Sequence, residues 1–169
     1  MERVKKQNNV LNKILTYFKN NYKQMLISFG GVFLVALLGS LLVDPNSVWF
    51  NSLIKPSFYP PNFLFSLVWT ILYVALGFSL YFVLKHNNSK KIVNLFIING
   101  VLNVLWNLVF FRLHSSFFGV IVLVVLIVFA YFLLKELYKA NKLSFYLAVP
   151  YFLWLFFAFL LNYSIFFLN

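Results

Sequence analysis

Residues 49–77 read WFNSLIKPSFYPPNFLFSLVWTILYVALG, a proline-rich aromatic loop that runs without a break into an uncharged apolar segment. Each of the three prolines fixes its own backbone angle and restrains the residue before it. The apolar segment that follows carries Trp69, Thr70 and Tyr73. This pattern predicts a stiff loop beside a membrane-spanning helix. A stiff loop suits a lid over a binding site, because less ordering entropy is then lost on binding.

The composition of the chain requires a lipid environment. Of its 169 residues, 63% are hydrophobic, and the mean hydropathy is +0.88. A soluble domain of this size could not bury so much apolar surface. There is no cysteine, and there are only three acidic residues and two histidines. These counts exclude disulfides and thiolate sites and leave little for acid–base or metal chemistry, so we expect no metal and no cofactor.

Five uncharged runs are each long enough to cross a hydrocarbon core of about 30 Å. Each run is predicted to be an α-helix, because lipid cannot satisfy open backbone groups, and short connections make neighbouring helices antiparallel. The predicted fold class is an all-α integral membrane protein, a five-transmembrane-helix bundle with a structured first extramembrane loop. The predicted spans are Met25–Val43, Asn62–Leu84, Ile92–Phe111, Ser115–Leu134 and Leu143–Leu168.

The basic residues predict the orientation of the bundle. The net charge is +11, and all but two of the fourteen basic residues lie before the first span or in the loops after the second and fourth spans. The exceptions are Lys55 and Arg112. The positive-inside rule therefore predicts a cytoplasmic N-terminus, with the first loop and the C-terminus outside a bacterial cell membrane. Charge that flanks apolar segments indicates membrane lipid as a partner and no nucleic acid.

The first 24 residues lie outside the predicted bundle. Residues 1–24 form a basic extension whose apolar residues recur at helical spacing. This suits an amphipathic helix on the inner leaflet and equally a disordered tail. Residues 25–169 form a single membrane domain.

Three of the predicted spans concentrate polar and aromatic residues on one face. Amides are costly in hydrocarbon unless hydrogen-bonded, so these faces are expected to point toward one another. The asparagines could serve only to join helices and the tryptophans only to pack or to form an interfacial belt. A pocket for a flat, largely apolar ligand with a polar edge explains both residue types together. The residues are Trp69 and Tyr73 in the second span, Asn103, Trp106 and Asn107 in the third, and Tyr151, Trp154 and Ala158 in the fifth.

Four motifs, in order along the chain, resemble the TspO/MBR family, which comprises the bacterial tryptophan-rich sensory proteins and the translocator or peripheral-type benzodiazepine receptor proteins. The resemblance covers about residues 26–169. The motifs are Trp49 with Leu53, Lys55-Pro56 and Pro60-Pro61 in the first loop; Trp69-Thr70-x-Leu72-Tyr73 with Gly77; Leu102-Asn103-x-x-Trp106 with Phe110-Phe111; and Pro150-Tyr151-x-x-Trp154-x-x-Phe157-Ala158-x-x-Leu161-Asn162.

The resemblance implies a homodimeric receptor or sensor with a ligand pocket beneath the first loop. Its expected ligand is protoporphyrin IX or a related tetrapyrrole such as haem. Phe58 stands where the family loop usually has tryptophan, and it is the substitution most expected to alter what the loop admits. The ligand-binding residues that the resemblance and the polar faces indicate are Trp49, Pro56, Phe58, Trp69, Tyr73, Asn103, Trp106, Asn107, Tyr151, Trp154 and Ala158.

Two other functions stay open. A light-dependent porphyrin-degrading enzyme would need the porphyrin to supply the chemistry, since no conventional catalytic constellation is present. The resemblance implies that Trp69 and Trp154 would then be the reacting side chains. A passive porphyrin or lipid transporter is also compatible, although the spans lack the mid-depth charge that ion coupling requires. Lys55 is either an interfacial lysine or a partner for a ligand carboxylate, and His114 is expected to be a solvated loop residue.

A cysteine-accessibility assay tests the predicted orientation in this naturally cysteine-free chain. We expect Asn51→Cys to react with a membrane-impermeant maleimide added outside the cell. Asn88→Cys should react only after the membrane is opened, because it lies in a predicted cytoplasmic loop. Labelling of Asn88→Cys from outside would contradict the topology.

Overall fold

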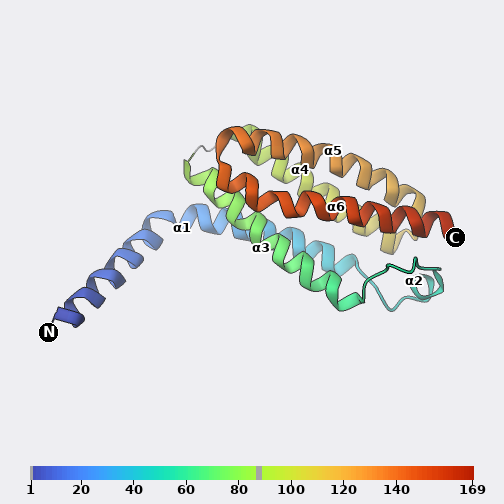
Figure 1. Cartoon of the computed structure of the whole chain (residues 1–169), viewed down its shortest axis with the longest axis horizontal. Coiled ribbons are helices and arrows are strands. Elements are labelled where there is room, and N and C mark those ends of the chain that lie inside the picture. The colour runs from blue at the N-terminus through green and yellow to red at the C-terminus, as the bar shows by residue number, and fades with distance from the viewer. Residues whose placement is uncertain (1, 87–88) are drawn as a thin grey trace.

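The computed structural model describes residues 2–86 and 89–169, with side chains described at residue 16, residues 21–86 and residues 89–169. Within these ranges all regular structure is helical (Figure 1). Five helical segments are long and apolar enough to span a membrane, which confirms the predicted fold class. The elements are α1 (Glu2–Leu42), α2 (Val48–Ser52), α3 (Asn62–His86), α4 (Lys90–Asn107), the π-helical turn η1 (Leu108–Arg112), α5 (Ser116–Ala140) and α6 (Lys142–Leu168).

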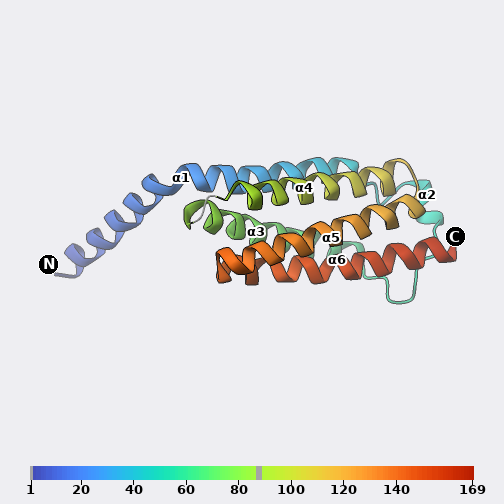
Figure 2. The same cartoon turned by 90° about the horizontal axis from the view of Figure 1, so that it is seen from above.

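The long helices lie lengthwise beside one another, and α2 lies at the end of the bundle where the chain also terminates (Figures 1 and 2). The five spanning helices form a closed ring in the order α1, α3, α6, α5 and α4. Helices α3 and α4 are consecutive in the chain, yet they contact each other little. The ring places α1, α3, α4 and α6 around a common interior.

Several helices continue past the predicted ends of the spans. Helix α5 runs to Ala140 rather than stopping at Leu134. The predicted span ended at the first charged residue. A helix can continue past that point, because long basic side chains extend their charged ends to the membrane surface and because positive charge stabilises a helix C-terminus. Glu136 in this extension pairs with Lys91 of α4 at 2.9 Å and with Lys139 at 3.7 Å.

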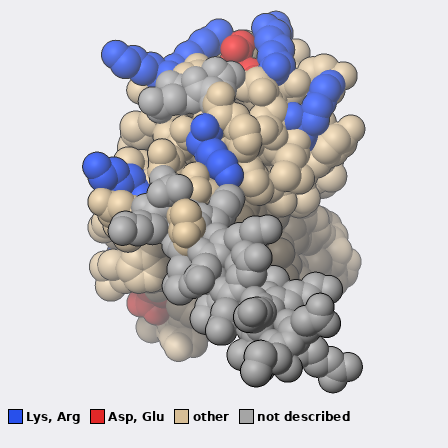
Figure 3. Space-filling view, turned by 90° about the vertical axis from the view of Figure 1, so that its left-hand side faces the viewer, with Lys and Arg blue, Asp and Glu red and all other residues tan. Residues whose placement is uncertain are grey.

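Basic side chains gather at the end of the bundle opposite α2, as Figure 3 shows. They belong to α1, to the C-terminal ends of α3 and α5 and to the N-terminal ends of α4 and α6. The structure thus separates a basic end from the end that carries the proline-rich loop, as the charge pattern predicted. The described lysines at the basic end are Lys23, Lys85, Lys90, Lys91, Lys135, Lys139 and Lys142.

The N-terminal extension belongs to α1, whose backbone is helical from Glu2 onward. In Figure 1 its first part projects away from the bundle. The apolar side chains that would form its amphipathic face, at residues 10, 11, 14, 15 and 18, lie outside the described residues. The membrane-surface role of this extension therefore stays a prediction.

Helices α3 and α6 are joined toward their basic ends by two fully buried serines. The Ser79 hydroxyl donates to the Ser144 backbone carbonyl at 2.8 Å, and the Ser144 hydroxyl donates to the Ser79 carbonyl at 3.0 Å. Each hydroxyl satisfies a polar group that lipid could not satisfy. The pair holds together two neighbouring helices that both contribute side chains to the cavity described below.

We expect Ser79→Ala and Ser144→Ala each to lower the free energy of unfolding by about 0.6–1.7 kcal/mol, the range measured for hydrogen bonds between membrane helices. Titration with sodium dodecyl sulfate in bicelles measures this change. Ser40→Ala is the matched control, because the exposed Ser40 hydroxyl bonds only to Leu37 of its own helix. An equal loss in Ser40→Ala would contradict a role for the serine pair in joining helices.

Candidate functional site

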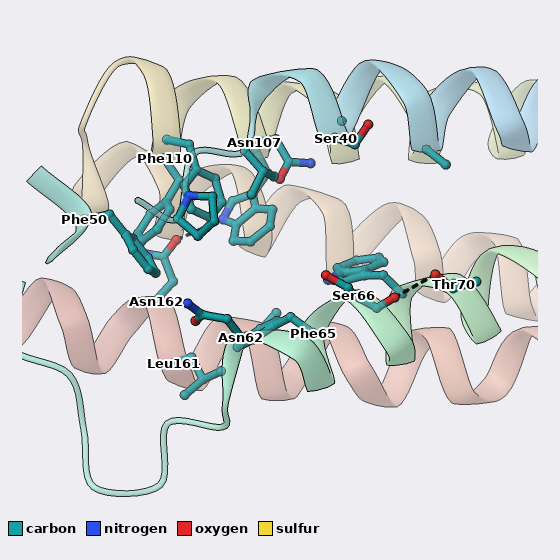
Figure 4. Close-up of a pocket in the computed structure, with 18 of the residues that line it drawn as sticks. Ser40, Phe50, Asn62, Phe65, Ser66, Thr70, Asn107, Phe110, Leu161 and Asn162 are labelled. Carbon is teal, nitrogen blue, oxygen red and sulfur yellow. Dashed lines mark hydrogen bonds between the residues drawn. The ribbon is translucent and has the colours of Figure 1, made fainter. Parts of the chain in front are cut away.

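A cavity of about 660 Å³ lies at the α2 end of the bundle, beneath the segment between α1 and α3. We call this segment, residues 43–61, the lid. The cavity volume falls within the range of about 300–1,000 Å³ that is usual for ligand pockets. Figure 4 shows lining side chains arriving from α1, the lid, α3, α4 with η1, and α6. Its aromatic lining consists of Phe33, Phe50, Tyr59, Phe63, Phe65, Trp69, Tyr73, Trp106, Phe110 and Phe111.

The cavity also opens sideways between α1 and α3. Phe33 of α1 and Phe63 of α3 both line it, yet their side chains remain 67% and 68% exposed. These exposed faces lie on membrane-spanning helices. A molecule dissolved in the bilayer can therefore approach the cavity without passing through the lid.

The α3 wall of the cavity is a group of aromatic rings in mutual contact. The ring centroids of Trp69 and Tyr73 lie 5.5 Å apart, and those of Trp69 and Tyr151 lie 6.3 Å apart. The Tyr73 hydroxyl donates a 2.8 Å hydrogen bond to Asn103 Oδ1. This bond orients Tyr73, and the rings of both Trp69 and Tyr73 line the cavity.

The opposite wall depends on the π-helical turn η1. Within it, the Leu113 amide donates to the Leu108 carbonyl at 3.0 Å, which is the wide i→i+5 bond of such a turn. The turn allows the adjacent residues Phe110 and Phe111 both to line the cavity. The Phe110 ring also stacks on Trp106, with centroids 5.8 Å apart. No sequence pattern predicted this turn.

Asn162 links three helices at the lid end of the cavity. Its Oδ1 accepts a 2.9 Å hydrogen bond from Trp106 Nε1, and its Nδ2 donates to the Ser116 carbonyl at 2.9 Å. A Cβ atom at Gly119 would lie 2.6 Å from Asn162 Oδ1, so glycine is needed for this approach. Asn162 also lines the cavity, although it was not among the predicted ligand-binding residues. The sequence feature that could have identified Asn162 as a site residue is its position on the same helical face as Tyr151, Trp154 and Ala158.

The structure brings part of the predicted ligand-binding set together. Two members of this set do not line the cavity but contact residues that do: Tyr151 contacts the Trp69 ring, and Asn103 accepts a hydrogen bond from Tyr73. The buried Nδ2 of Asn103 has no hydrogen-bond partner among the described residues. Those that line the cavity are Trp69, Tyr73, Trp106, Asn107 and Ala158.

Trp154 lies outside the cavity lining. Its ring contacts Phe65, with centroids 5.8 Å apart, and Phe65 itself faces the cavity. Trp154 instead borders a shallow apolar hollow between α3 and α6, beside Pro150. Phe65 therefore stands between Trp154 and the cavity. The buried Trp154 Nε1 has no hydrogen-bond partner among the described residues.

The lid has a defined structure. The Ser47 hydroxyl caps α2 by accepting from the Phe50 amide at 3.2 Å, and α2 directs Phe50 inward until only 2% of it is exposed. The Tyr59 amide donates to the Pro56 carbonyl at 2.9 Å. Burial raises the pKa of Tyr59 to about 12, so its phenol stays neutral at physiological pH. Phe50 and Tyr59 are the lid residues that contribute aromatic rings to the cavity, whereas the predicted Trp49, Pro56 and Phe58 do not line it.

Two contacts fasten the lid to the rest of the bundle. The Asn169 side chain accepts from the Ile54 amide at 2.9 Å and donates to the Ile54 carbonyl at 3.1 Å. Trp49 stacks on His114, with ring centroids 4.7 Å apart. His114 is exposed, as predicted, and its φ of 51° places it in the left-handed region that few side chains adopt.

Comparison with known proteins agrees with the geometry. The family model described as TspO/MBR family matches residues 28–168. The chain is 37% identical to tryptophan-rich protein TspO of Chlorobaculum tepidum over 129 residues, which are 74% of this chain and 82% of that protein. It is 30% identical to tryptophan-rich protein TspO of Archaeoglobus fulgidus over 152 residues, 88% of this chain and 99% of that protein.

The similarity extends to animals. The chain is 31% identical to the human translocator protein over 134 residues, which are 76% of this chain and 79% of that protein. The family match covers four of the five spanning helices completely and most of the first span. It also includes the lid and every wall of the cavity. This chain is therefore a five-helix integral membrane protein that belongs to the TspO/MBR family.

Proposed function

We propose that the protein is a membrane receptor or sensor that binds a tetrapyrrole, such as protoporphyrin IX, in the cavity beneath the lid. The observation that carries this proposal is a cavity of about 660 Å³ walled by aromatic side chains on α3, η1 and the lid. A porphyrin is a flat conjugated ring, and flat rings gain energy from offset or edge contacts with aromatic faces. The few polar groups in the wall, such as Asn107 and Asn162, are neutral amides and hydroxyls suited to a polar ring edge.

The walls are ordered in a way that favours binding. Trp69 is held between Tyr73 and Tyr151, and the Trp106 indole N–H is bonded to Asn162. The orientation of both tryptophan rings is therefore already determined before a ligand binds. The lid is likewise tied down at Ile54 and Trp49. A pre-ordered site loses less conformational entropy when its ligand binds.

Light-dependent degradation of the bound porphyrin is a second candidate function. One observation favours it: Trp69, an oxidisable indole, lines the cavity. A light-excited porphyrin in the cavity would meet this ring directly and, with oxygen as co-reactant, would react there first. Trp154 is separated from the cavity by Phe65 and would take part only after Phe65 moved.

Binding is tested by titrating protoporphyrin IX into the protein in lipid nanodiscs and following the porphyrin absorbance. We expect saturable binding that Trp69→Phe weakens about two- to tenfold, because an aromatic contact contributes about 0.5–1.5 kcal/mol. Tyr146→Phe is the control, since Tyr146 is exposed near the start of α6 and does not line the cavity. Non-saturable binding, or equal weakening in both variants, would contradict the proposed site.

Illumination separates the receptor from the enzyme. If the protein degrades porphyrin, Trp69→Phe should slow the loss of the porphyrin absorption band more than Trp154→Phe, because Trp69 borders the cavity and Trp154 does not. The Trp69→Phe/Trp154→Phe variant should bleach porphyrin more slowly than the unmodified protein, and any rate above that in empty nanodiscs would point to Trp106, which also lines the cavity. Equal bleaching by the unmodified protein and this double variant would rule out degradation that depends on Trp69 or Trp154.

A further inference from the structure

The cavity lining contains no charged side chain among the described residues. An ionised carboxylate placed inside would lose its hydration without a cation to compensate, which is costly. A ligand that carries a carboxylate must therefore keep that group outside the aromatic walls. The lid end of the cavity is the place where such a group can remain at the membrane surface.

Lys55 lies beside the lid end of the cavity, over two of its rings, and is not itself a lining residue. Its Nζ atom is 4.1 Å from the centroid of the Phe50 ring and 5.5 Å from that of Tyr59. Both rings line the cavity, so the ammonium group rests against the cavity wall. A cation over aromatic faces is held by the negative potential of the rings.

The backbone around Lys55 is anchored on both sides. Ile54, the residue before it, is bonded through both its amide and its carbonyl to the Asn169 side chain. Pro56, the residue after it, has a restricted backbone angle and accepts the Tyr59 amide at 2.9 Å. The base of the Lys55 side chain is therefore fixed beside the cavity, while its flexible stem lets the ammonium group reorient.

The positive charge of Lys55 is not neutralised by another described side chain. Both ion pairs found among these residues involve Glu136, at the basic end of the bundle. Asp44, the acidic residue of the lid, accepts the Asn46 amide at 3.2 Å and makes no ion pair with Lys55. Arg112, the other basic residue at the lid end, donates to the Leu41 carbonyl at 2.8 Å. Among the described residues, Lys55 is the basic residue whose charged group is found over rings of the cavity wall.

We propose that Lys55 binds an acidic group of the ligand, so that the site selects tetrapyrroles with a free carboxylate over their neutral esters. This proposal rests on the proposed function and names a specificity-determining residue of the same site. The macrocycle occupies the aromatic cavity, and the carboxylate meets the ammonium group at the lid. A charge-assisted hydrogen bond of this kind is stronger than one between neutral groups. The side opening between α1 and α3 lets the macrocycle enter from the bilayer while its acidic edge stays near the surface.

Protoporphyrin IX and its dimethyl ester form a matched pair of probes for this proposal. Each is titrated into the full chain in nanodiscs of zwitterionic phosphatidylcholine, so that lipid charge does not contribute. We expect the unmodified protein to bind the acid more tightly than the ester. Lys55→Met should weaken binding of the acid about tenfold and leave binding of the ester unchanged.

Two further variants serve as controls. Lys55→Arg keeps the charge and should retain the preference for the acid. Lys90→Met removes an exposed charge at the opposite end of the bundle and should change neither affinity. Unchanged ester binding by Lys55→Met also shows that this variant is folded.

Three results would overturn the proposal in distinguishable ways. Equal weakening of acid and ester by Lys55→Met would show that Lys55 supports only the packing of Phe50 and Tyr59. Tight binding of both porphyrins with no preference for the acid would contradict the proposal and leave the tetrapyrrole site intact. Failure of either porphyrin to bind the unmodified protein would contradict the proposed function itself, and this proposal with it.

Discussion

The hydrogen bond from the Trp106 indole to Asn162 is the interaction on which the lid end of the bundle depends. Polar groups inside a membrane must find partners within the protein, because lipid supplies none. Asn162 meets this requirement for α4 through Trp106 and for α5 through the Ser116 carbonyl. One amide on α6 thereby sets the spacing of three helices. Gly119 allows the contact by leaving room beside Asn162 Oδ1.

The cavity follows from this spacing. With Trp106 held, the π-helical turn after it directs Phe110 and Phe111 into the space between α4, α1 and α6. The lid closes the same end, because Phe50 packs inward against these rings and Tyr59 packs against Phe50. The described lining of the site is aromatic and uncharged, and Lys55 of the lid lies over two of its rings. Such a site is suited to a flat ligand whose charge remains at the surface.

The sequence predicted the helical walls of the site better than it predicted which lid residues face the cavity or which helical residues are covered by a neighbouring helix. Trp69, Tyr73 and Trp106 were predicted because aromatic and amide residues recur at helical spacing, and all three line the cavity. Phe50 and Tyr59 were missed because an irregular loop has no periodicity that shows which side chains point inward. Trp154 shares the helical face of Tyr151 and Ala158, but Phe65 from α3 stands between it and the cavity. A pattern within one helix does not show what a neighbouring helix places in front of it.

Hydrophobicity and charge are local properties, so the linear sequence alone was enough to establish five spanning helices, a basic end and a structured loop. The order of the helices around the ring is not local. Consecutive helices α3 and α4 barely touch, whereas α3 packs on α1 and α6. That order depends on which polar groups find partners across the bundle, as Ser79 and Ser144 do. Tertiary packing therefore decided which aromatic side chains line the cavity and which basic residue lies beside its lid end.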